Sequence, residues 1–185
     1  MITIIRAAAV AATLALVGAA AAQGQEYPAS LGTWQDRALI EQTLQRYVAG
    51  FDQNDPALFA SAFAEDGVFE YNDDVYSGRD AIAGFIEQRN VGRTDREASG
   101  ASDSSARLYH VMTNSLIMFE DDTHATHTAY GMTIGRTTEE THISSSGSYT
   151  DQLVKEDGGW LIQHRHLDQL PVFTPPAATD APAAQ

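Results

Sequence analysis

The segment RLYHVMTN, residues 107–114, places one histidine in a run that is typical of a β-strand. Successive strand side chains point to opposite faces, so His110 is expected to share one face with Leu108, Met112, Asn114, Leu116 and Met118. That face is mostly apolar and is predicted to point inward. A buried imidazole needs hydrogen-bond partners and titrates near neutrality, which makes His110 a candidate proton shuttle. The alternative is a core histidine with satisfied hydrogen bonds.

Asp52 is the second candidate for proton transfer, because it lies at the C-terminal end of a predicted helix, where the helix dipole disfavours negative charge. In a closed pocket, desolvation would raise the pKa of Asp52, and a protonated His110 would oppose that rise. Such a pair could take a proton from carbon and deliver one to a leaving hydroxyl. The alternative for Asp52 is a solvated helix end.

Four further side chains could contact a substrate. Tyr47 and Tyr71 could donate hydrogen bonds to a carbonyl that gains negative charge, or simply fill the core. Asn114 could orient His110, bind substrate or bond to the sheet. Tyr149 shares a strand face with Asp151, which is either a pocket acid or the partner of Arg165; we favour the pairing with Arg165.

The remaining histidines do not predict a metal site. His124 and His127 are three residues apart, which sends them to opposite faces of a strand. His164 and His166 share a face, but the spacing places no third ligand. The sequence also contains no Gly-rich phosphate loop and no serine nucleophile elbow, and we expect neither a metal nor a cofactor.

These residues lie within one predicted domain of about 140 residues, 33–170. Residues 1–22 have the order of a secretory signal peptide: one positive charge, a short apolar run and small residues before a cleavage site. That run is too short for a bilayer-spanning helix, so we expect a periplasmic or secreted protein with no integral membrane span after cleavage. Residues 23–32 are expected to be a short N-terminal segment that leads into the domain. The Pro/Ala-rich residues 171–185 are expected to be a disordered tail.

Charge and cysteine content narrow the functional classes. The formal net charge of −14 opposes binding to nucleic acid or anionic lipid. The chain contains no cysteine, which excludes disulfides, thiolate catalysis and cysteine-ligated metals.

The hydrophobic pattern predicts helices first and strands afterwards. A capping box at residues 33–36 opens an amphipathic helix that ends near 52–54. A short helix over 57–64, a strand over 67–71 and a helix over 81–89 follow, and residues 91–106 are predicted to be a mobile loop. Strands over 107–119, 124–137, 142–155 and 159–168 are joined by short turns, which indicates an antiparallel meander and an α+β fold.

The element order and several segments resemble the SnoaL-like, or nuclear transport factor 2-like, superfamily. The matching segments are LQRYVAGFDQNDPALFASAFAEDGVFEY, GRDAIAGF, RLYHVMTN and GSYTDQLVKEDGGWLIQHR, and the resemblance covers about residues 33–170. It implies a cone-shaped α+β barrel, in which three N-terminal helices pack on a strongly curved antiparallel sheet around one mostly apolar pocket. Members often form homodimers, so the resemblance also implies a homodimer.

Position by position, the resemblance is best to the scytalone dehydratase-like branch. Asp52 falls on its helix-end aspartate, Tyr71 on a substrate-polarising tyrosine and His110 on a catalytic histidine. Phe51 replaces a second tyrosine, and the other catalytic histidine has no secure counterpart. In ketosteroid isomerase, Tyr47 would match the oxyanion-hole tyrosine and Asp151 its aspartate partner, but Tyr71 occupies the position of the base.

The sequence therefore predicts an exported domain that binds a small, apolar, cyclic molecule. Asp52 and His110 would catalyse a cofactor-independent dehydration or isomerisation, with Tyr47, Tyr71, Asn114, Tyr149 and Asp151 binding the substrate. The alternative is a non-catalytic ligand-binding or dimerisation module of the same fold.

Overall fold

The computed structural model describes residues 32–100 and 107–170, which form an α+β fold with one six-stranded sheet. The predicted signal peptide, most of the short N-terminal segment after it and the predicted tail lie outside these residues. The elements are α1 (Trp34–Gln53), α2 (Pro56–Ala60), β1 (Phe63–Tyr71), β2 (Asp74–Ser77), α3 (Arg79–Ala98), β3 (Arg107–Phe119), β4 (His124–Arg136), β5 (Thr141–Glu156) and β6 (Gly159–Leu170). In the described ranges, no helix is long and apolar enough to cross a membrane.

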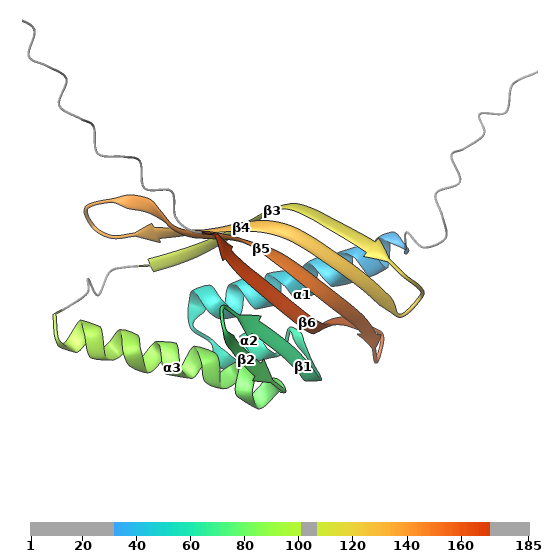
Figure 1. The fold of residues 1–185 in the computed structure, drawn as a ribbon, viewed down its shortest axis with the longest axis horizontal. Helices are drawn as coiled ribbons and strands as arrows, with labels where there is room; N and C mark the ends of the chain where they lie inside the picture. The colour runs from blue at the N-terminus through green and yellow to red at the C-terminus, as the bar shows by residue number, and fades with distance from the viewer. Residues whose placement is uncertain (1–31, 101–106, 171–185) are drawn as a thin grey trace, which may run out of the picture.

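The sheet is curved and unclosed, with the strand order β2-β1-β6-β5-β4-β3 (Figure 1). β3 to β6 form the predicted antiparallel meander, and β1 pairs in parallel with β6. Helix α1 contacts β6 and β3, whereas α3 contacts β1 and β2. The helices thus cover the inner face of the sheet, as the α+β prediction requires.

Helix α1 begins at the predicted capping box. The Thr33 side chain accepts a hydrogen bond from the Asp36 backbone N–H, and the Asp36 carboxylate accepts one from the Thr33 backbone N–H. The helix ends at Asn54, whose left-handed backbone (φ 55°) caps it. This end holds Asp52 close to the sheet.

One apolar core joins the helices to the sheet. Buried side chains from α1, α2 and α3 pack against those of β1, β3, β4, β5 and β6 in a single cluster. Gly50 of α1 lies so close to the Phe59 backbone that a Cβ would overlap it. This close approach fixes α2 against the C-terminal half of α1.

Two predicted helix ends are wrong, and one strand was not predicted. The second helix ends at Ala60 because the following apolar residues pair with β6: Phe63 faces Ile162 in the strand ladder. Residues 91–98 belong to α3 rather than to a loop; they contain no proline, and their backbone continues the helix from its packed first half. The short strand β2, which pairs with β1, was not predicted.

The predicted alternation of β3 holds for its first half only. Asn114 has a left-handed backbone (φ 53°), and the ladder to β4 is shifted between Thr113 and Leu116. This bulge exchanges the two faces of the strand. Leu116 and Met118 were predicted to point inward, but they are 53% and 50% exposed, and the intervening Ile117 is buried instead.

Candidate active site

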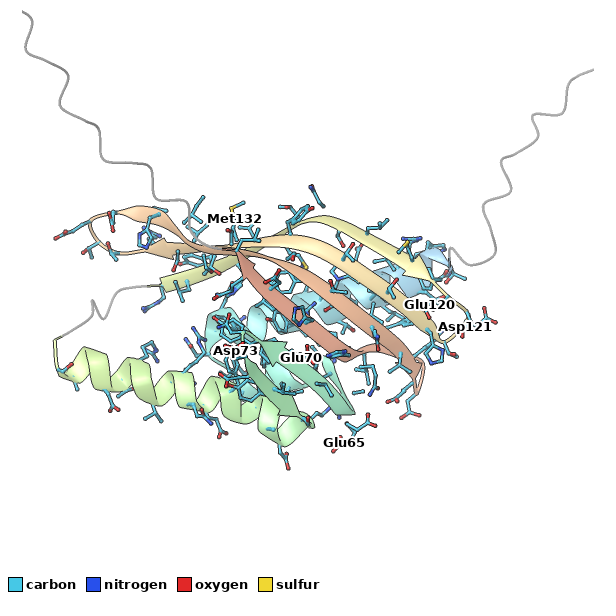
Figure 2. All side chains as sticks on the ribbon, in the orientation of Figure 1. Glu65, Glu70, Asp73, Glu120, Asp121 and Met132 are labelled. Atoms are coloured by element: carbon cyan, nitrogen blue, oxygen red, sulfur yellow. The ribbon has the colours of Figure 1, made fainter. Side chains whose placement is uncertain are left out.

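A cavity of about 600 Å³ lies among α1, α3 and strands β1 and β3 to β6. Its volume is within the range of small-molecule binding sites. Apolar lining residues are Phe51, Leu108, Met132, Leu167 and Leu170; polar ones include Arg89, His110, Ser145 and Gln169. In Figure 2, Met132 lies toward one end of the sheet, and Glu120 and Asp121 lie at the β3–β4 turn near the other end. Residues with polar side-chain groups outnumber apolar ones in this lining, so the cavity is more polar than the mostly apolar pocket that the resemblance implied.

Asp52 is in direct contact with His110, which lines this cavity, although Asp52 itself is not among the lining residues. His110 Nδ1 lies 2.5 Å from Asp52 Oδ1, and the His110 backbone N–H donates to both carboxylate oxygens at 3.1 and 3.2 Å. Because a carboxylate can only accept, Nδ1 carries the proton and Nε2 keeps a lone pair. The two side chains are 19% and 9% exposed. The arrangement provides an oriented base that a ligand can approach.

Phe51 and Arg89 support the His110 ring from the helical side. The Phe51 and His110 ring centroids are 4.3 Å apart in an edge-to-face arrangement, and the Arg89 guanidinium lies 3.8 Å from the centre of the Phe51 ring. Both residues also line the cavity. Phe51, which replaces a tyrosine of the scytalone dehydratase pattern, therefore packs on the candidate base.

Two tyrosines bring hydroxyl groups to the same cavity. The Tyr71 oxygen accepts a hydrogen bond from Gln169 Nε2 at 2.9 Å, so its own proton can be donated elsewhere. Burial raises the pKa of Tyr149, so its hydroxyl stays protonated at neutral pH. The Tyr149 ring packs directly against Gly131, where a Cβ would overlap it. Tyr71 can therefore act as a hydrogen-bond donor to a ligand, and the Tyr149 side chain forms part of the cavity wall.

Besides Asp52, three predicted site residues lie apart from the lining of the cavity. Asn114 is exposed at the β3 bulge. Tyr47 is 1% exposed in the core, where its ring lies 4.0 Å from the Arg165 guanidinium. Asp151 is fully buried and pairs with Arg165, as favoured from the sequence. The structure thus places His110, Tyr71 and Tyr149 in the lining of one cavity, with Asp52 bound to His110.

The Asp151–Arg165 pair belongs to a buried polar network. Arg165 Nε and Nη2 donate to the two Asp151 oxygens at 2.7 and 2.6 Å, and His127 Nδ1 lies 2.7 Å from Asp151 Oδ2. Burial alone would raise the pKa of Asp151, but the Arg165 charge and these hydrogen bonds hold it below its usual value. Asp151 therefore stays ionised. No group of three or more His, Asp or Glu side chains within residues 32–100 and 107–170 is placed to hold a metal ion.

Sequence reasoning missed Arg89 and the serines of β5. Arg89 lies at the end of the predicted third helix, but nothing in the local pattern showed which face would meet the cavity. Ser144, Ser145 and Ser146 line the cavity from β5. Three consecutive serines in a predicted strand are a composition signal that could have indicated a polar wall.

The comparison with known families concerns the domain as a whole. The SnoaL-like domain family matches residues 32–166. The chain belongs to this family. No curated protein matches it in sequence. Among solved structures, this SnoaL-like protein is similar to Rv3472 of Mycobacterium tuberculosis, a protein of unknown function, at 27% identity and a TM-score of 0.61, over 80% of this chain and 84% of that one.

Two further structures are similar to this SnoaL-like protein. A candidate scytalone dehydratase from Novosphingobium aromaticivorans has 27% identity and a TM-score of 0.57, over 74% of this chain and 85% of that one. A protein from Catenulispora acidiphila, solved in complex with S-DNPA, has 22% identity and a TM-score of 0.55, over 72% and 92%. The second likeness concerns the fold alone.

Proposed function

We propose that this SnoaL-like protein binds a small, largely apolar, cyclic molecule and catalyses a cofactor-independent dehydration or isomerisation of it. The observation that carries the proposal is the contact of Asp52 with His110, a residue that lines the cavity. A histidine held by a carboxylate through Nδ1 is oriented to accept a proton at Nε2. The likeness to a candidate scytalone dehydratase supports the same reaction class.

In the proposed dehydration, His110 Nε2 removes a proton from the carbon next to a carbonyl group. The electrons of the C–H bond form the new double bond as the C–O bond of a neighbouring hydroxyl breaks. The His110 imidazolium returns the proton to the departing oxygen, which leaves as water, and Asp52 stabilises the charged ring meanwhile. Tyr71 and Tyr149 donate to the carbonyl oxygen as it gains negative charge.

The alternative is a non-catalytic binding module, in which Asp52 would face solvent or neighbouring side chains would block His110. The Asp52 side chain is 19% exposed and bonded to His110, and His110 lines the cavity. This geometry favours the catalytic proposal over the alternative.

The test begins with a thermal-shift screen of small cyclic hydroxyketones against the purified protein. Each ligand that binds is then assayed for conversion by wild type, His110→Ala and Asp52→Asn. We expect both variants to bind but to lose about 10²- to 10⁴-fold in kcat, the typical contribution of general acid–base catalysis. His124→Gln is the matched control, because His124 lies at the far β3–β4 turn. Ligands that bind but are never converted by wild type would establish the binding-module alternative.

We also propose that the protein is exported and forms a homodimer. Export is supported by the signal-peptide order of residues 1–22; N-terminal sequencing of the periplasmic form should give a new N-terminus near Gln23. Dimerisation through the outer sheet face is supported by Leu116, Met118 and Tyr130, which are at least 50% exposed on neighbouring strands. Light scattering should give twice the mass of one chain, and the mass of a monomer would contradict the proposed homodimer.

A further inference from the structure

A second cluster with catalytic geometry lies outside the cavity, across strands β3, β4 and β5. The Ser115 hydroxyl is 2.8 Å from His127 Nε2, and His127 Nδ1 is 2.7 Å from Asp151 Oδ2. His127 and Asp151 are fully buried, whereas Ser115 is exposed. The strand register creates this alignment, because His127 lies directly opposite Asp151 in the β4–β5 ladder.

The hydrogen bonds fix the direction of proton transfer within this cluster. Asp151 can only accept, so His127 Nδ1 carries the proton and Nε2 accepts from the Ser115 hydroxyl. Arg165 holds the far side of Asp151 through two hydrogen bonds of 2.7 and 2.6 Å. The carboxylate is therefore fixed in place and orients the imidazole. This is the relation between nucleophile, base and orienting acid that serine hydrolases use.

The backbone conformation around Ser115 directs its side chain toward His127. Asn114 and Ser115 together face the single residue Ala129, because Thr113 pairs with Tyr130 and Leu116 pairs with Thr128. Simple alternation predicted Ser115 on the outer face, and the bulge turns it toward His127 instead. β3 is an edge strand of the described sheet.

We propose that Ser115 is the nucleophile of a second catalytic site, which takes an acyl group from a small ester. His127 Nε2 accepts the hydroxyl proton while the Ser115 oxygen forms a bond to the ester carbonyl carbon. The bond to the alcohol oxygen then breaks, and His127 returns the proton to the alcohol. Water, activated by His127 in the same way, releases the carboxylic acid and restores Ser115. Asp151 and Arg165 act as positioning residues.

The site is tested with p-nitrophenyl acetate as the probe on the full-length protein. The tryptic peptide 108–136 contains Ser115 as its single serine, so mass spectrometry can assign an acetyl group within it. We expect a burst of p-nitrophenolate and an acetyl group on Ser115. Ser115→Ala should abolish both, and His127→Gln should slow acetylation about 10²- to 10⁴-fold. Ser77, an exposed serine on the opposite edge strand β2, is the internal control and should stay unmodified.

A measurement on the wild-type protein alone tests the proposal even if a variant does not fold. Acetylation of Ser115 in the folded protein should exceed that of Ser77 at least 100-fold, and the two rates should become equal in denaturing urea. Equal rates in the folded protein, or an unchanged rate in folded His127→Gln, would overturn the proposal. Because the acetyl group is located on a residue outside the cavity, the result is independent of Asp52 and His110.

Discussion

At the scale of single residues, Asp52 and Asp151 each pair with a histidine, but they differ in burial. Asp52 contacts His110 beside an open cavity, whereas Asp151 contacts Arg165 and His127 where none of the three side chains is exposed. An ion pair without solvent depends entirely on its own partners, because removal of one charge leaves the other uncompensated. Stability is therefore expected to depend more on the buried Asp151–Arg165 pair than on the partly exposed Asp52–His110 pair.

Asp151→Asn should accordingly destabilise the protein by about 3–5 kcal/mol, the range for breaking a buried pair, because the Arg165 charge stays buried. Urea unfolding at neutral pH measures this loss. Glu65→Gln is the matched control: Glu65 pairs with Arg79 but its side chain is 87% exposed, so the change should stay within about 1 kcal/mol. Equal losses in the two variants would show that burial does not determine the strength of the Asp151–Arg165 pair.

At the scale of elements, the N-terminus of α1 is tied to the β5–β6 hairpin through Asp36. Its carboxylate accepts from Lys155 Nζ at 2.8 Å and from Trp160 Nε1 at 2.9 Å, in addition to the capping box with Thr33. The Lys155 contact, with the Thr33 and Trp160 hydrogen bonds, lowers the pKa of Asp36 well below its usual 3.8. One side chain thus joins the first helix to the last two strands.

This contact predicts a pH-dependent stability. A carboxylate with a lowered pKa in the folded state stabilises the protein fully above its unfolded pKa, near 3.8, and loses that contribution as the pH falls through the folded value. Asp36→Asn should therefore cost about 1–3 kcal/mol at pH 7, and the difference from wild type should shrink below pH 4. Unfolding free energies measured between pH 7 and pH 2 test this; a difference that stays constant with pH would contradict it.

Substitution by alanine at two helical glycines is expected to change the stability of the protein in opposite directions. Gly84 of α3 has open space where a Cβ would lie, so Gly84→Ala should stabilise the protein by about 0.5–1 kcal/mol through helix propensity. Gly50 of α1 lies against the Phe59 backbone, so Gly50→Ala should destabilise it by about 1–3 kcal/mol. Thermal unfolding of the two variants, each the control of the other, gives the comparison. Stabilisation by both would mean that α2 can move away from α1.

The same elements show which features a sequence can predict. The bounds of β3 and the capping box of α1 follow from local periodicity and side-chain chemistry, and both are confirmed. The end of α2 at Ala60 and the bulge at Asn114 depend on pairing with distant strands, which local pattern does not contain. For the same reason Asp52 and His110 could be paired through a family resemblance, whereas the contact of Ser115 with His127 appears only once the strand register is known.

At the scale of the whole molecule, the described domain has one continuous core. Buried side chains of all three helices and of five strands belong to a single cluster, which no linker divides. Asp36 adds a polar connection between the two ends of the domain sequence. Such a domain is expected to unfold in one cooperative step, because no group of elements has a separate core to retain.

The two tryptophans allow this expectation to be measured. Trp160 is 1% exposed in the core, whereas Trp34 is 74% exposed. In Trp34→Phe, tryptophan fluorescence therefore reports on Trp160 alone, and far-ultraviolet circular dichroism reports on helices and strands together. The two signals should give the same urea midpoint and the same slope, since loss of the core and loss of secondary structure are one event. An earlier fluorescence transition would mean that the β6 region opens while the rest of the fold persists.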